Sequence, residues 1–243
     1  MISIILGAGE IGQSYYDILT KNEKVGKVFR VDVDKKKTDK LPCENVHLMH
    51  VCLRWSDRWF SIVKAAIKKY RPEVVNVMST VPPGTTASLG NVAVHSTTRG
   101  LHPYLSDFIK ATPKHVGGPQ AKKVADYFQE FGIQCITHSR AKTTEVAHIL
   151  SNSLYAVQIA FADELEKACR MYGVDYYHSV MRYSETHNEG YAKMGLVSKF
   201  RPILTPPNAR IGGHCVINAL KMIDPDKRGP IMELLLSKEL DKC

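Results

Sequence analysis

The chain has 243 residues, of which 44% are hydrophobic and 23% are charged. These values are typical of a globular protein with one large domain or two small ones. No apolar run approaches the roughly 20 residues of a membrane span. Because the first predicted strand begins at Ile2, we expect no signal peptide and a cytoplasmic location. The six cysteines form no CxxC pair and no Cys/His metal spacing, which argues against disulfides and against a metal site.

The net charge of the chain is +9. Three explanations stay open: a solvated basic surface, an anionic small-molecule substrate, and a nucleic-acid partner. The lysines are spread along the chain rather than gathered in a tail, and no basic segment is interleaved with aromatic residues. We therefore rank nucleic acid last of the three.

The N-terminal segment predicts a dinucleotide site. Residues 2–6 form a short β-branched apolar run typical of a buried parallel strand, and residues 11–19 indicate a helix. Glycines between the two permit a tight turn and close approach of a pyrophosphate, which the helix N-terminus favours. The predicted cofactor contacts in this segment are Gly7, Gly9, Glu10, Ile11 and Gly12.

A second predicted strand, residues 27–31, ends at Asp32, about 20 residues after the glycines. A carboxylate at this position accepts hydrogen bonds from a ribose 2′-hydroxyl and repels a 2′-phosphate. We therefore predict NAD rather than NADP as the cofactor. Lys35, Lys36 and Lys37 lie just beyond and weaken that preference.

The alternation of strands and helices continues to about residue 140. Residues 45–53 and 73–78 indicate strands, and residues 59–70 an amphipathic helix. Ser79 and Thr80 follow the second of these strands, at the carboxyl end where ligands bind in parallel sheets, and both are predicted cofactor contacts. Further predicted elements are a strand at 91–95, a helix at 121–131 and a strand at 133–137.

A long helix from residue 145 to about 172 follows, with Thr143 or Thr144 as its cap and Gly173 at its end. Its predicted buried face consists of Val146, Leu150, Leu154, Val157, Phe161 and Leu165. This length suggests a central helix that joins two domains or two subunits, so we expect a homodimer packed along it.

The predicted fold class is α/β. A Rossmann-type, mostly parallel sheet with helices on both faces occupies residues 1–141. A long central helix and a small helical domain for substrate binding and dimerisation occupy residues 142–243.

Three motifs carry a family resemblance: Ser79-Thr80-Val81-Pro82-Pro83-Gly84-Thr85, Leu150-Ser151-Asn152, and Gly212-Gly213-His214-Cys215. On these motifs the chain resembles the UDP-glucose/GDP-mannose dehydrogenase family, within the 6-phosphogluconate dehydrogenase-like group. In that family NAD oxidises a primary alcohol of a sugar twice, through a cysteine-bound thiohemiacetal and thioester. The resemblance implies that Cys215 is the nucleophile, that Thr80 positions water, and that Asn152 binds the reacting oxygen.

Cys215 suits this role chemically, because a thiolate attacks an aldehyde and the adduct can pass on a second hydride. The glycine-rich stretch from Asn208 to Cys215 predicts a flexible loop that carries this thiol. In the same stretch, Arg210, Gly212 and Gly213 are predicted substrate contacts. The alternative is that Cys215 is a small buried residue near a turn.

The chain also departs from the family pattern. His148 stands where the family has a lysine, and Ala219 stands where it has an aspartate. Histidine is the better base near neutral pH, so His148 is a predicted catalytic residue. The family's PEF segment is absent, and its place holds Arg99 and His102, which form either an anion site or a solvated loop.

Family members carry a further C-terminal domain that grips the nucleotide, whereas this chain ends at Cys243. We expect a substrate smaller than a nucleotide sugar, or a partner that supplies the grip. The predicted function is an NAD-dependent dehydrogenase that oxidises a CH–OH group of a sugar-like or hydroxy-acid, anionic substrate. Loss of the lysine and the aspartate favours a single, reversible hydride transfer. The alternative is a non-catalytic NAD-binding regulator or subunit derived from the family.

Overall fold

The computed structural model describes residues 1–22, 26–41, 45–100, 103–206 and 214–240, with the side chains of 214, 215 and 238–240 excepted. The chain divides into two compact units, Met1–His148 and Ile149–Cys243. The division falls inside the long helix, whereas the sequence placed it between residues 141 and 142. Each unit is described separately below.

The first unit is built on a seven-stranded sheet in the order β2-β1-β3-β4-β5-β6-β7. Its strands are β1 (Ile2–Leu6), β2 (Lys27–Val31), β3 (Leu48–Val51), β4 (Val74–Val77), β5 (Ala93–His95), β6 (Lys114–Gly117) and β7 (Cys135–His138). All neighbouring strands are parallel except β5 and β6, which pair antiparallel. The mostly parallel sheet predicted from the sequence is therefore confirmed.

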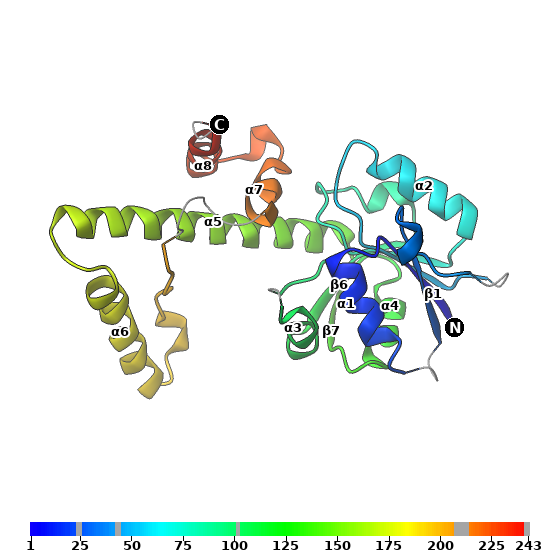
Figure 1. Cartoon of the computed structure of the whole chain (residues 1–243), viewed down its shortest axis with the longest axis horizontal. Helices are drawn as coiled ribbons and strands as arrows, with labels where there is room; N and C mark the ends of the chain where they lie inside the picture. The colour runs from blue at the N-terminus through cyan, green and yellow to red at the C-terminus, as the bar shows by residue number, and fades with distance from the viewer. Residues whose placement is uncertain (23–25, 42–44, 101–102, 207–213, 241–243) are drawn as a thin grey trace. The chain divides into compact units, whose positions relative to one another are not determined.

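Helices cover both faces of this sheet (Figure 1). They are α1 (Glu10–Leu19), α2 (Trp59–Tyr70), α3 (Leu105–Ala111) and α4 (Ala121–Gln129). One apolar cluster joins α1, α3 and α4 to one face through residues such as Tyr15 and Phe128. The other cluster joins α2 to the opposite face through Trp59 and Val63. These two layers hold the carboxyl ends of β1 and β4 in place.

Several boundaries differ from the sequence prediction. The strands predicted at 45–53, 73–78 and 91–95 are shorter, and the helix predicted at 121–131 ends two residues earlier. The last predicted strand lies at Cys135–His138 rather than 133–137. Helix α3 and strand β6 were not predicted, because α3 is short and β6 begins with a lysine whose burial the sequence does not reveal.

The second unit is helical. The long helix α5 (Ala141–Met171) begins in the first unit and continues into the second, and Gly173 follows it with a left-handed φ of +70°. The remaining elements are a π-helical turn at Tyr177–Met181 and the helices α6 (Arg182–Lys193), α7 (His214–Lys221) and α8 (Pro230–Leu240). Among the described residues, none of these helices is long and apolar enough to cross a membrane.

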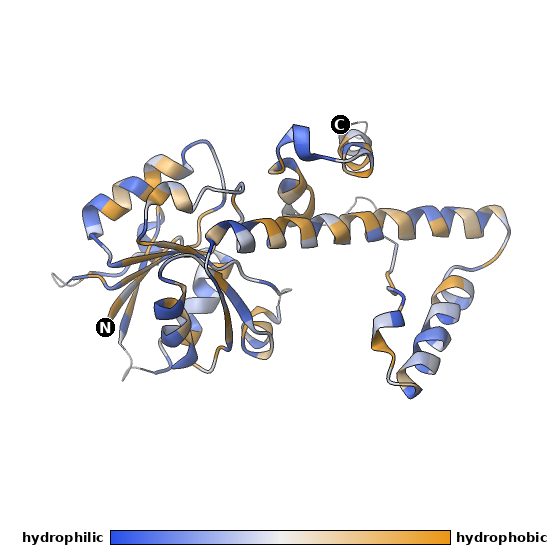
Figure 2. Cartoon of the chain, turned by 180° about the vertical axis from the view of Figure 1, so that it is seen from behind, coloured by the Kyte–Doolittle hydropathy of each residue, from blue (hydrophilic) through white to orange (hydrophobic). Residues whose placement is uncertain are grey.

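The start and the buried face of α5 both differ from the prediction. Because α5 begins at Ala141, Thr143 and Thr144 lie inside its first turn rather than before it, and Thr144 Oγ1 donates to the carbonyl of Ala141 at 2.9 Å. The residues that pack against α7 and α8 are Ile149, Ala156 and Ile159. The predicted face is covered only in part by the described residues, since Val157 packs against the same cluster whereas Leu154 and Phe161 are each 60% exposed. Figure 2 shows hydrophobic positions along the length of this helix.

Candidate functional site

The glycine turn between β1 and α1 is shaped to bring the two elements close together. Gly7 has a φ of +97°, and a Cβ there would lie 2.9 Å from Leu53 Cδ2. A Cβ on Gly12 would lie 1.9 Å from the carbonyl oxygen of Gly7, so only glycine lets α1 pack on the turn. A Cβ on Gly9 would meet no atom within 4 Å, which leaves open space at the helix N-terminus.

This arrangement fits a dinucleotide. Gly9 is the N-cap of α1 and provides no side-chain cap for the first backbone N–H groups of the helix. Helix N-termini of this kind bind phosphate through such N–H groups and through the helix dipole. The turn therefore has the shape of a pyrophosphate cradle, and Glu10 and Ile11 lie in the first turn of α1, which begins one residue before the predicted start.

Asp32 ties the end of β2 to the glycine turn. Its carboxylate accepts the Ala8 N–H at 2.7 Å and the Asp34 N–H at 2.9 Å. A carboxylate has further lone pairs that can accept ribose hydroxyls. Lys35–Lys37 form an exposed 3₁₀ turn directly after it, so the acidic and basic groups of the sequence prediction are neighbours in the structure.

Ser79 and Thr80 follow β4 but have different surroundings. Ser79 is buried, and its hydroxyl donates to the carbonyl of Val51 at 3.2 Å and accepts from the indole N–H of Trp59 at 3.4 Å. Its hydroxyl therefore holds β4 to its neighbours. Thr80 is half-buried, and its Oγ1 lies 3.1 Å from Nε2 of His148. Two predicted catalytic residues are thus in direct contact.

Glu145 fixes the loop that carries Thr80, a role that sequence reasoning missed. Its buried carboxylate accepts the N–H of Gly84 at 2.5 Å and the N–H of Thr86 at 2.8 Å. Hydrogen bonds from backbone N–H groups to a carboxylate are among the stronger ones in proteins. The signal available in the sequence was an acidic residue three positions before His148 in the same predicted helix.

His148 is held in its neutral form. Burial, together with the positive charges of Lys114 and Arg99, lowers its pKa to about 4. His95 lies in a similar environment: its Nδ1 is 2.8 Å from Thr144 Oγ1, and burial lowers its pKa to about 3. At neutral pH His148 therefore presents an uncharged ring to Thr80 and does not supply the fixed positive charge of the family's lysine.

The remaining predicted site residues lie elsewhere in the chain. Asn152 follows one turn after His148 in α5 and is half-buried. Cys215 is the second residue of α7 rather than part of a loop, and the loop prediction is wrong at this position. Its side chain lies outside the described residues, as do His102, Arg210, Gly212 and Gly213. Ala219 is buried in α7.

Arg99 lies on the loop after β5 and donates to the carbonyl of Pro113. It lines a small pocket together with Tyr15 and Lys114, two residues that sequence reasoning did not select. Among the residues that the structure describes, no group of three or more His, Cys, Asp or Glu side chains is arranged to hold a metal ion.

The sheet of the first unit and its glycine turn define a Rossmann-like fold. Residues 142–228 match the model of the central domain of the UDP-glucose/GDP-mannose dehydrogenase family. The predicted resemblance to that family is therefore confirmed for this part of the chain. No curated protein matches the sequence.

Solved structures share the fold at low sequence identity. UDP-D-ManNAc dehydrogenase from Pyrococcus horikoshii aligns with a TM-score of 0.77 and 18% identity over 98% of this chain and 68% of its own. 3-Hydroxyisobutyrate dehydrogenase from Mycobacterium tuberculosis aligns with a TM-score of 0.70 and 14% identity over 99% of this chain and 93% of its own. UDP-glucose dehydrogenase from Pyrobaculum islandicum aligns with a TM-score of 0.66 and 16% identity over 99% of this chain and 64% of its own.

Proposed function

We propose that the protein is a nicotinamide dinucleotide-dependent dehydrogenase that oxidises a CH–OH group of an anionic, sugar-like or hydroxy-acid substrate. The observation that carries this proposal is the contact of Thr80 Oγ1 with His148 Nε2, at the carboxyl edge of the sheet that also holds the glycine turn. The family match of residues 142–228 supports the same class of reaction.

The cofactor we propose is NAD. Gly7, Gly9 and the N-terminus of α1 would hold its pyrophosphate, and Asp32 would accept hydrogen bonds from its adenosine ribose. The Asp32 carboxylate opposes a 2′-phosphate, whereas the exposed Lys35–Lys37 turn attracts one. When bound, the nicotinamide supplies the hydride acceptor.

The role of His148 follows from its neutral ring. It would accept the proton of the substrate hydroxyl at Nε2, while the hydroxyl of Thr80 orients the ring and the substrate oxygen. Because the pKa of His148 is lowered to about 4, its neutral form prevails at every pH above about 5. While the first unit stays folded, protonation of His148 therefore does not limit the reaction above about pH 5.

Asn152 and Cys215 are the proposed substrate contacts of the second unit. Asn152 would bind the reacting oxygen through its amide, as the family resemblance implies. With histidine and alanine in place of the family's lysine and aspartate, we propose one reversible hydride transfer rather than the complete thioester cycle. Cys215 would then contact the substrate without forming a thioester, because a thioester requires a second hydride transfer.

The test combines cofactor binding with turnover. Calorimetric titration with NAD and NADP measures the cofactor preference, and a panel of hydroxy acids, sugar phosphates and nucleotide sugars is screened for NADH formation. We expect His148→Ala to lower kcat by about 100-fold or more while the NAD affinity changes less than about twofold. His178→Ala, at a side chain that is 93% exposed, is the matched control.

Two outcomes would contradict the proposal. The first is native turnover in His148→Ala, which would remove the proposed base. The second is tight NAD binding without turnover of any substrate in the panel, which would favour the non-catalytic NAD-binding protein.

We also propose a homodimer packed along α5. At 100° per residue, Leu150, Leu154 and Phe161 form a stripe on the side of α5 away from Ile149 and Ala156. The first three are 44%, 60% and 60% exposed, whereas the other two are buried. A helix that is apolar on two sides needs a second neighbour, and a second copy of the same helix supplies a matching surface.

A further inference from the structure

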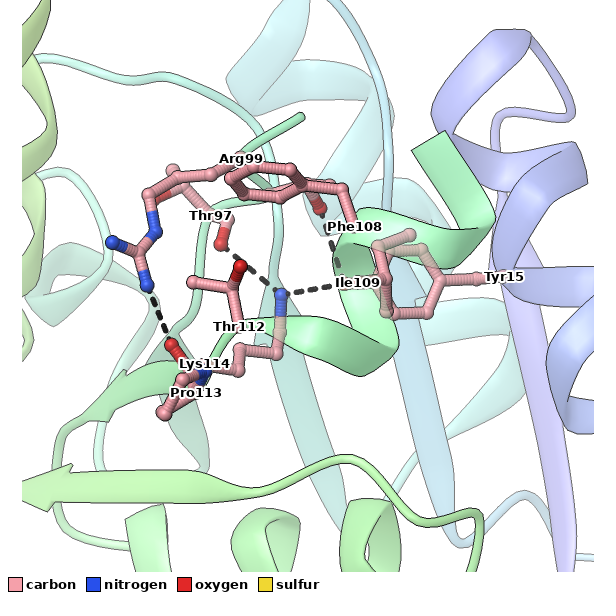
Figure 3. A pocket seen from close by; sticks show the side chains of 9 residues that line it. Tyr15, Thr97, Arg99, Phe108, Ile109, Thr112, Pro113 and Lys114 are labelled. Atoms are coloured by element: carbon pink, nitrogen blue, oxygen red, sulfur yellow. Dashed lines mark hydrogen bonds between the residues drawn. The ribbon is translucent and has the colours of Figure 1, made fainter. Parts of the chain in front are cut away.

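A small pocket lies between α1, the loop after β5, α3 and the start of β6, all within the first unit (Figure 3). Its polar lining comes from Tyr15, Thr97, Thr98, Arg99, Thr112 and Lys114. The cavity volume is about 10 Å³, which is room for one water-sized group. None of the described residues that line it is acidic.

Lys114 lies at the inner wall of this pocket. The residue is only 5% exposed, and its Nζ donates to Tyr15 Oη at 2.9 Å and to the carbonyl of Thr97 at 3.1 Å. Both acceptors are uncharged, and an ammonium group has three N–H donors. A buried amine without a carboxylate partner is costly to ionise, so burial lowers the pKa of Lys114 to about 7.

Arg99 lies on the opposite, exposed side of the same pocket (Figure 3). Its Nη2 donates to the carbonyl of Pro113 at 2.5 Å, and a guanidinium group has five N–H donors in a planar fork. The positive charge of Arg99 contributes to the lowered pKa of Lys114. A lysine and an arginine thus line one pocket whose described lining contains no carboxylate, and Thr98 and Thr112 also line it.

We propose that Arg99 and Lys114 form a binding site for an oxyanion, the phosphate or carboxylate group of a small molecule, and that Lys114 takes up a proton from solvent when the anion binds. One oxygen of the anion would occupy the cavity and accept from the Lys114 ammonium. The rest of the group would lie at the mouth, where Arg99 offers a bidentate fork. The proposal concerns binding alone and does not depend on the dehydrogenase reaction.

Because the anion binds the protonated form of Lys114 more tightly than the neutral form, the affinity for the anion depends on pH through this residue. The titratable or charged groups around Lys114 are Tyr15 on α1, His50 on β3, Cys52 after β3, His95 on β5, Arg99 on the loop, Cys135 on β7 and His148 on α5. Burial raises the pKa of Tyr15, raises that of Cys52 to about 12 and that of Cys135 to about 11. It lowers the pKa values of the three histidines to between about 3 and about 4. Guanidinium groups do not lose their proton in proteins, so Lys114 is the member of this set that changes charge between pH 6 and pH 9.

The experiment follows the lysine Cε signals of the full chain, labelled with ¹³C, during pH titrations with and without sodium sulfate. Sodium chloride keeps the ionic strength constant, and sulfate is the probe because its charge does not change over this range. Lys114 is recognised by a titration midpoint near 7, and Lys114→Arg confirms the assignment by removing the signal. We expect saturating sulfate to raise the midpoint by about one pH unit, so that sulfate binds about tenfold more weakly at pH 9 than at pH 6.

Variants separate this site from other anion sites, including the glycine turn. Arg99→Gln should abolish the sulfate-dependent rise in the Lys114 midpoint while the signal still titrates near neutral pH. Arg58→Gln, an exposed arginine that precedes α2, should leave the rise unchanged. Titrations with methyl phosphate and with acetate show whether phosphate or carboxylate groups are preferred. The proposal is overturned if none of the three anions moves the Lys114 midpoint, or if Arg99→Gln leaves the rise intact.

Discussion

The two compact units of this chain differ in how completely they bury their own apolar side chains. In the first unit both faces of the sheet are covered, and Trp59 and Phe128 are fully buried on opposite sides of it. In the second unit α7 and α8 cover one side of α5, while Leu154 on the other side is 60% exposed. Helix α6 has no buried residue at all.

This difference indicates that the two units have different roles. A unit that closes its own core can hold a cofactor site rigidly, because the strand and helix that flank the glycine turn are fixed by buried side chains such as Ile5 and Tyr15. A unit with an uncovered apolar stripe depends on another molecule to cover it. We therefore expect changes in the first unit to alter folding and cofactor binding, and changes in the stripe of the second unit to alter assembly.

The largest effect is expected from a methyl group added to the glycine turn. Gly12→Ala places a Cβ 1.9 Å from the carbonyl oxygen of Gly7, so α1 must move away from β1. We expect a loss of about 3 kcal/mol or more in the free energy of unfolding. Chemical denaturation followed by tryptophan fluorescence measures it, because Trp55 and Trp59 both lie in the first unit.

Gly9→Ala is the matched control for that substitution. Its Cβ meets nothing within 4 Å and its φ of −73° suits any residue. It should leave the free energy of unfolding nearly unchanged and weaken NAD binding, because the added methyl occupies the space proposed for the pyrophosphate. Equal destabilisation by both substitutions would contradict the assigned geometry of the turn.

The two units should differ in their stability toward acid. His50, His95 and His148 all lie in the first unit, and burial lowers their pKa values to about 3, 3 and 4. Each neutral ring stabilises the folded state above pH 6.5, and this stability is lost as the pH falls from 6.5 toward the folded pKa. Each histidine then costs up to about 1.4 kcal/mol per pH unit in this window.

The measurement compares tryptophan fluorescence with hydrogen exchange of α6 and α8 between pH 7 and pH 4. We expect the first unit to lose its structure at a higher pH than the second. His50→Gln should remove about a third of the pH dependence. A first unit that keeps constant stability over this range would show that the three rings are not buried as described.

The exposed stripe of α5 is tested by Leu154→Asp. A charge at the centre of the proposed dimer interface should weaken self-association by about 100-fold, since it removes a buried leucine and adds an unpaired carboxylate. Sedimentation equilibrium measures the dissociation constant. Lys167→Gln, on the opposite side of the same helix, removes only an exposed ion pair with Asp163 and should leave association unchanged. A native chain that is monomeric at all concentrations would contradict the dimer.

Local patterns in the sequence predicted most of the first unit. The features that form the glycine turn all lie within about thirty positions: the apolar run of residues 2–6, the three glycines and Asp32. Each of them determines the conformation of its own short segment, so the predicted turn matches the structure. Strand β6 escaped detection because its first residue is Lys114, and nothing in the sequence indicates that this amine is buried.

The errors in the second unit have a different cause. Periodicity found an apolar stripe on α5, but it could not indicate that α7 and α8 cover the other side through Ile149 and Ala156. The glycines before Cys215 suggested a loop, whereas α7 begins at His214. Both features depend on contacts between residues that lie far apart in the chain. The hydrogen bonds of Glu145 to Gly84 and Thr86 are long-range contacts of the same kind, and the sequence did not indicate them either.

The smallest effect expected comes from Glu145, which holds the Thr80 loop against the start of α5. Glu145→Gln retains one carbonyl acceptor but turns an NH₂ group toward a backbone N–H, so one of its two hydrogen bonds is lost. We expect a loss of about 1–2 kcal/mol in the free energy of unfolding. Because the loop positions Thr80 beside His148, kcat should fall about tenfold while NAD affinity stays within about twofold.

A substitution at an exposed glutamate shows whether the effects of Glu145→Gln arise from a misplaced Thr80 loop or from the loss of one negative charge. Glu130→Gln removes a carboxylate that is exposed after α4 and should change neither quantity. Glu145→Asp keeps the charge but shortens the side chain, so it should restore part of the stability while kcat stays low, because the loop is held in a shifted position. If Glu145→Gln instead weakens NAD binding as strongly as it lowers kcat, the loop serves the cofactor rather than the Thr80–His148 pair.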